Sequence, residues 1–103
     1  MNESTNAACP QAKPPRFELG KVVATPGALR LLEAYSLNPL ELLARHAQGE
    51  WGDVCPEDAQ ANDRGLIDGD RLLSAYALPG GERVWVLTEC DRSVTTILLP
   101  SEY

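Results

Sequence analysis

Acid–base chemistry is the reaction type for which this sequence offers the clearest set of side chains. The single histidine, His46, lies near the end of a predicted helix, and two arginines and two threonines follow in predicted strands and turns: Arg83, Arg92, Thr95 and Thr96. An imidazole can transfer protons near neutral pH, and a guanidinium can stabilise negative charge that develops on a phosphoryl group. Brought together by the fold, these groups would suit a small ribonuclease or toxin-like enzyme.

Each of these residues also has a purely structural explanation. A histidine in the last turn of a helix is favoured by the helix dipole. Threonine is common in strands, and the pair Asp91-Arg92 suits a turn. No spacing in the sequence requires His46 and Arg83 to meet, so both interpretations stay open.

An acidic segment is the second candidate for function. Residues 50–70 hold seven carboxylates and one arginine, which accounts for the whole net charge of −6. Such a surface could bind a basic protein or imitate a nucleic acid, or it could be a solvated helix with its flanking loops. Direct binding to nucleic acid is disfavoured, because phosphate contacts need clustered Lys and Arg. The binding candidates are Glu50, Asp53, Glu57, Asp58 and Asp63.

Metal and cofactor sites are not expected. His46 and the nearby carboxylates lack the spacing of known zinc motifs, and the sequence has no phosphate-binding, dinucleotide-binding or nucleophile-elbow motif. The cysteines Cys9, Cys55 and Cys90 are irregularly spaced, which is typical of reduced thiols and predicts a cytoplasmic protein. No apolar run is long enough to cross a membrane, and the N-terminus does not read as a signal peptide.

Three helices are predicted in the first part of the chain. Thr25 and Asn38 each precede a proline, an arrangement typical of capped helix starts, and apolar residues at helical spacing follow both. Residues 56–64 form a third, weaker helix that is expected to stop near Gly65. Its only apolar residues are alanines, so we expect it to lie on the surface.

Strands are predicted at residues 17–24 and, after the helices, at residues 71–78, 83–90 and 93–99. The last three alternate with period two and are joined by short turns, which predicts an antiparallel meander. The fold class is therefore α+β, with two to three short helices packed on a three- or four-stranded antiparallel sheet. We expect Trp85 to join the leucines of the helices in the core.

The polar, proline-containing residues 1–15 predict a disordered tail, followed by a single α+β domain over residues 16–103. A chain of 103 residues suits one domain.

Three segments carry a resemblance to a known family. They are ATPGAL at residues 24–29, LLARHAQGEWGD at residues 42–53, and VWVLTECDRSVTTILLPSEY at residues 84–103. From Phe17 onward the sequence resembles a family of small proteins carried by bacterial plasmids and integrative elements, some of which are labelled as associated with type I restriction systems. The resemblance implies a mobile-element setting and supplies no catalytic residues.

Two functional hypotheses follow from the sequence. The first is a small acidic cytosolic accessory protein that binds another protein and acts in counter-defence or regulation. The second is the ribonuclease-like enzyme built on His46. The sequence identifies neither the protein partner nor the oligomeric state.

The predicted tail should be dispensable for folding. Deletion of residues 1–15 should leave the free energy of unfolding unchanged within about 0.5 kcal/mol, because polar residues without an apolar pattern have little to bury. Urea unfolding of the full and truncated chains tests this. A large loss of stability would show that the tail packs on the domain.

Overall fold

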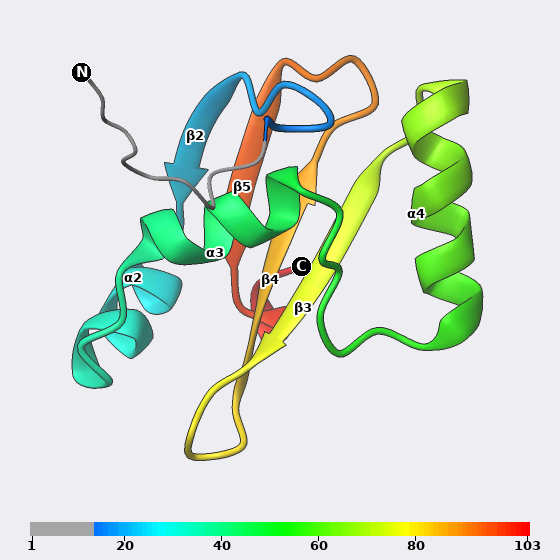
Figure 1. Ribbon diagram of the computed structural model, residues 1–103. Helices are drawn as coiled ribbons and strands as arrows, with labels where there is room; N and C mark the ends of the chain where they lie inside the picture. Colours follow the sequence, from blue (N-terminus) through cyan, green and yellow to red (C-terminus); the bar gives the residue numbers. More distant parts are fainter. Residues whose placement is uncertain (1–13) are drawn as a thin grey trace, which may run out of the picture.

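The computed structural model describes residues 14–103, which form a sheet and three α-helices (Figure 1). Helices α2 and α3 lie over one face of the sheet, and α4 stands beside its edge. The helices are α2 (Pro26–Ala34), α3 (Pro39–Ala47), α4 (Pro56–Asp68) and the 3₁₀ helix η1 (Pro100–Glu102), and the strands are β2 (Lys21–Ala24), β3 (Leu72–Ala77), β4 (Arg83–Thr88) and β5 (Val94–Leu98). The predicted α+β class is confirmed. The tail predicted for residues 1–15 lies almost wholly outside the described residues.

The sheet is mixed, so the expectation of a purely antiparallel sheet is wrong. Its strand order is β2-β5-β4-β3. Strands β3, β4 and β5 form the predicted antiparallel meander, but β2 pairs with β5 in parallel. Parallel pairing needs a long crossover, and the helices between β2 and the meander provide one.

The first strand is shorter than predicted because of Gly20. This glycine has a φ of 66°, in the left-handed region, and the chain turns there before β2 begins at Lys21. A side chain at Gly20 would collide with the backbone carbonyl groups of Arg92 and Ser93. Residues 17–19 therefore pass along the sheet as an irregular segment.

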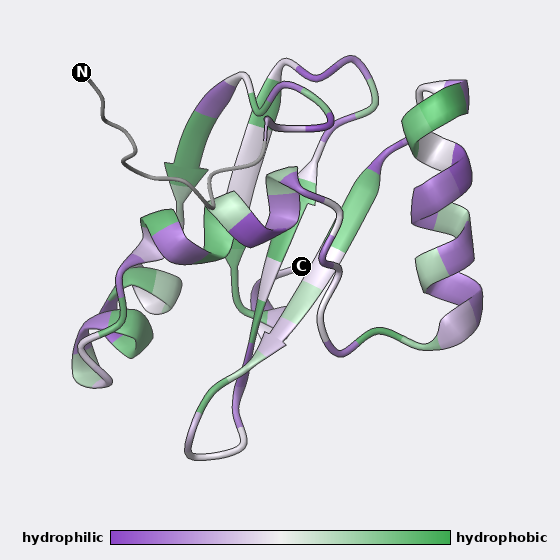
Figure 2. Ribbon diagram, viewed as in Figure 1, coloured by the Kyte–Doolittle hydropathy of each residue, from purple (hydrophilic) through white to green (hydrophobic). Residues whose placement is uncertain are grey.

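The helices begin where the sequence predicts. The Thr25 side chain accepts a hydrogen bond from the Ala28 N–H, and the Asn38 side chain accepts one from the Leu40 N–H. Helix α4 is longer than predicted: it continues through Gly65 to Asp68 and is capped by Gly69, whose φ is 79°. Most of α4 is exposed, and Figure 2 shows it as largely hydrophilic.

The core lies between α2, α3 and the inner face of the sheet. Its buried members are Ala28, Leu32, Leu42, Leu43, Tyr76, Leu78, Val84, Val86 and Ile97. Trp85 is not among them, contrary to expectation. Alternation along β4 directs Val84 and Val86 toward the helices, so Trp85 points to the opposite face and packs edge-to-face on Tyr103, with ring centroids 5.6 Å apart.

The outer edge of β3 is closed by hydrogen bonds to two other segments. The Asn62 side chain of α4 donates to the Leu73 carbonyl at 2.8 Å and accepts from the Leu73 N–H at 3.1 Å. The Ala75 N–H donates to the Trp51 carbonyl, and the Ala75 carbonyl accepts from the Asp53 N–H. Asn62 therefore fixes α4 against the sheet as an additional strand would.

Replacing Asn62 by alanine should destabilise the protein markedly. The change leaves the Leu73 N–H and carbonyl without a hydrogen-bond partner at a place that the buried Asn62 side chain shields from water. Loss of these bonds costs about 1–3 kcal/mol. The matched control is Gln60→Ala, an exposed position of the same helix that should stay within about 0.5 kcal/mol of the wild type. Urea unfolding measures both variants, and equal midpoints for Asn62→Ala and wild type would contradict the role of Asn62.

Candidate functional site

His46 is fully buried between α3 and the inner face of the sheet. Its Nδ1 lies 2.6 Å from Ser74 Oγ on β3, and its Nε2 lies 2.9 Å from Thr88 Oγ1 on β4. Thr88 Oγ1 is 2.7 Å from Thr95 Oγ1 on β5, which in turn donates to the Leu19 carbonyl at 2.7 Å. One chain of hydrogen bonds thus joins a helix, three strands and the irregular segment before β2.

The hydrogen positions in this network of hydrogen bonds can be assigned by starting from its last acceptor, the Leu19 carbonyl. The Thr95 hydroxyl hydrogen is used on the Leu19 carbonyl, so Thr95 Oγ1 accepts from Thr88. Thr88 Oγ1 must then accept from His46, which places the imidazole hydrogen on Nε2 and leaves Nδ1 to accept from the Ser74 hydroxyl. A neutral histidine satisfies every partner.

The electrostatic surroundings favour the same neutral state. Burial, with a smaller contribution from the positive charge of Arg92, lowers the pKa of His46 from 6.5 to about 4. The imidazole is also walled off by aromatic rings: Phe17 lies edge-on at 5.2 Å between centroids, and Trp51 lies at 5.7 Å. A general base must reach its substrate, and this imidazole is enclosed on its sides and bonded at both nitrogens.

Arg92 binds backbone carbonyl groups. Its Nη2 donates to the Gly65 carbonyl at 2.9 Å, and its Nη1 donates to the Asp70 carbonyl at 2.7 Å. Nη1 also lies near the carbonyls of Glu89 and Cys90. The guanidinium therefore caps the carboxyl end of α4 with a positive charge, where the helix dipole favours one.

Arg83 and Thr96 lie apart from His46. Arg83 forms an ion pair with Asp53 at 2.7 Å on the surface. Thr96 pairs with Val23 and Leu87 and points to the face of the sheet opposite the helices. Of the five candidates for acid–base chemistry, the structure brings only His46 and Thr95 into one network, and that network is internal.

The acidic candidates separate into two groups. Glu50 is 3.7 Å from Arg45, Asp53 pairs with Arg83, and Asp63 accepts a hydrogen bond from the Trp51 indole at 3.0 Å. Glu57 and Asp58 are exposed in the first turn of α4 and form no ion pair with another described residue.

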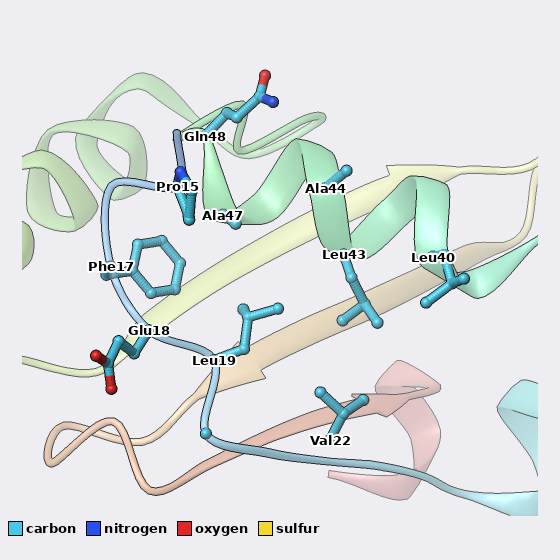
Figure 3. A pocket seen from close by; sticks show the side chains of 11 residues that line it. Pro15, Phe17, Glu18, Leu19, Val22, Leu40, Leu43, Ala44, Ala47 and Gln48 are labelled. Atoms are coloured by element: carbon cyan, nitrogen blue, oxygen red, sulfur yellow. The ribbon is translucent and has the colours of Figure 1, made fainter. Parts of the chain in front are cut away.

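An apolar groove of about 640 Å³ lies between α3 and the segment that leads into β2. Figure 3 shows Phe17 and Leu19 on one side, with Leu43 and Ala47 of α3 facing them. Among the described residues that line it, Glu18 alone is charged. No sequence pattern predicts this groove, because it forms between segments that only the folded structure brings together.

Within the described residues, no group of three or more His, Cys, Asp or Glu side chains could hold a metal ion. No helix there is long and apolar enough to cross a membrane. Comparisons with protein-family models, curated proteins and solved structures found no match for the chain.

Sequence reasoning missed the two direct partners of His46, Ser74 and Thr88, although a signal was present. Ser74, Thr88 and Thr95 are the polar residues that interrupt the inward-facing positions of three otherwise apolar strands. Three such interruptions on one sheet face, with one histidine on the covering helix, indicate a shared buried network.

His46 should make stability depend on pH. The unfolded histidine takes up a proton near pH 6.5 and the folded one only near pH 4, so the unfolded state binds more protons between these values. The free energy of unfolding should therefore fall by about 2–3 kcal/mol as the pH drops from 7 to 4.5, beyond any loss from carboxylates.

The control for this effect is His46→Gln, which keeps the carboxylates and removes the titrating ring. Urea unfolding at several pH values should give a shallower pH dependence for the variant. Identical slopes for the two proteins would show that His46 does not titrate as its burial requires.

Proposed function

We propose that this chain is a protein-binding module that presents the exposed carboxylates of α4, and of the turn after it, to a basic partner protein. The observation that carries the proposal is a set of exposed carboxylates, on this helix and just after it, that form no ion pair with any described residue: Glu57, Asp58, Asp68 and Asp70. Arg64 is the only basic residue of α4. The resulting field would attract a positively charged surface and speed its association.

The way α4 is attached supports this role. Asn62 and Gly65 are its buried residues, and Asn62 binds the edge of β3. The inner side of the helix is thereby fixed, and the exposed carboxylates Glu57, Asp58 and Asp68 are held on a firm support. A rigidly held surface loses little conformational entropy when it binds.

Two of the carboxylates are placed where folding does not favour them. Asp68 is the last residue of α4 and Asp70 follows two residues later, near the negative end of the helix dipole. Arg92 offsets part of this cost through the Gly65 and Asp70 carbonyls. Negative charge kept at an unfavourable position supports a use outside the fold.

The wider setting rests on the sequence resemblance. It favours an acidic accessory protein of a bacterial plasmid or integrative element that works in the cytoplasm, in counter-defence or regulation. The alternative of a ribonuclease-like enzyme gains no support from the contacts of His46, Arg83 and Arg92, and an RNA-cleavage assay on the purified protein tests it directly.

Charge reversal on α4 should abolish partner binding. The triple variant Glu57→Lys, Asp58→Lys, Asp68→Lys leaves Asp63 intact, because Asp63 holds Trp51. Affinity capture with the wild type should retain basic proteins that the variant loses, and the affinity for an identified partner should fall with added salt because exposed charges are screened.

The matched control reverses three exposed glutamates elsewhere, as Glu33→Lys, Glu41→Lys, Glu89→Lys, which changes the net charge equally. This control should keep the partner. Equal retention by both triple variants would remove α4 as the binding surface, and equal loss in both would reduce the effect to net charge.

A further inference from the structure

The two outer edges of the sheet differ in whether their outward backbone groups are hydrogen-bonded. At β3 the outward N–H and carbonyl groups of Leu73 and Ala75 are all bonded, to Asn62 and to residues 51–53. At β2 no described residue hydrogen-bonds the outward backbone groups of Val22 and Ala24. The backbone N–H groups of Lys21 and Thr25 point the other way and donate to the Ser93 and Ile97 carbonyls. An unpaired strand edge is a template for another strand.

The side chains of this edge are also unusually apolar for an exposed position. Val22 is 43% exposed and Val23 is 38% exposed, one on each face of the sheet. On the helix side, Leu40 at the mouth of the apolar groove is 68% exposed. A strand added beside β2 would cover both valines. It would also close the side of the groove at Val22 (Figure 3).

We propose that β2 pairs antiparallel with β2 of a second copy of this chain, around a twofold axis at Val23, to form one continuous eight-stranded sheet. In this register Val22 lies opposite Ala24 of the other copy. Both residues point their backbone groups outward, so each such pair exchanges two hydrogen bonds. The twofold axis stands perpendicular to the sheet, which keeps the helices of both copies on the same face.

Charge complementarity selects a second copy as the occupant. The register places Lys21 opposite Thr25 of the other copy, and Thr25 donates a 2.5 Å hydrogen bond to the Glu102 carboxylate. Lys21 of each copy can therefore reach Glu102 of the other, which gives two symmetric ion pairs. The Thr25 and Leu99 hydrogen bonds, with the charge of Arg30, hold the pKa of Glu102 below its usual value, so this carboxylate stays ionised.

This pairing goes beyond the proposed function and does not depend on it. Helix α4 stands beside β3, at the opposite end of the strand order from β2. A dimer formed through β2 leaves both acidic helices at the far ends of the sheet. Two binding surfaces on one particle raise the avidity for a partner that carries two sites.

Light scattering or sedimentation equilibrium of the full chain, over a range of concentrations, tests the pairing. Val22→Pro removes an outward N–H and keeps every bond inside the sheet, since proline is tolerated at such edge positions. Its dimer dissociation constant should rise by at least about tenfold, and that of the control Val22→Thr, which keeps the N–H, should stay close to wild type.

Charge exchange tests the partner and the register together. Lys21→Glu alone and Glu102→Lys alone should each weaken the dimer, because each creates two like-charge contacts, by about tenfold at low salt. An equimolar mixture of these two variants should dimerise as well as wild type, since both contacts are again between opposite charges. Circular dichroism checks that each variant is folded.

Two results would overturn the proposal. A wild type that stays monomeric at all concentrations would show that β2 does not recruit a second copy, and would leave this edge for a strand of a different protein. A dimer that resists Val22→Pro and is not restored by the charge-exchanged mixture would use another surface.

Discussion

The hydrogen-bond chain through His46 is the constraint on which the arrangement of this domain depends. It runs from Ser74 through His46 and Thr88 to Thr95 and ends on the Leu19 carbonyl. Because His46, Thr88 and Thr95 each accept from one neighbour and donate to the next, removal of any of them leaves a buried polar group unpaired. Helix α3, the meander and the segment before β2 are therefore positioned together.

The elements that could be predicted from sequence are those specified locally. Thr25 and Asn38 begin helices because their side chains satisfy free N–H groups, and the meander follows from alternation and short turns. The direction of β2 could not be predicted, since no local feature distinguishes parallel from antiparallel pairing with β5. The face occupied by Trp85 was equally undetermined, because Trp85 and Val84 are both apolar and either could have pointed inward.

The same limit applies to the candidate sites. His46 and the arginines were identified by residue type, which is all that a sequence without a spaced motif offers. Their chemistry depends on partners far along the chain: Asp53 for Arg83, and the Gly65 carbonyl for Arg92. In these contacts both guanidinium groups bind other parts of the same chain, so they stabilise the fold and are not free to bind phosphate. The carboxylates Glu57, Asp58 and Asp68 of α4 differ, because none of them forms an ion pair within the described residues.

The positions of Ser74, Thr88 and Thr95 explain why a histidine at position 46 specifies the strand register better than an apolar side chain of similar size would. A strand that slips by one residue turns its inward side chains to the opposite face. An apolar core of Val84, Val86 and Ile97 would tolerate such a slip in part, because Trp85, Leu87 and Leu98 would replace them. The same slip would move Thr88 and Thr95 away from His46 and leave a buried imidazole without these hydrogen-bond partners. The network thus penalises the wrong register more than the apolar core does, and it supplies the specificity that alternating apolar strands lack on their own.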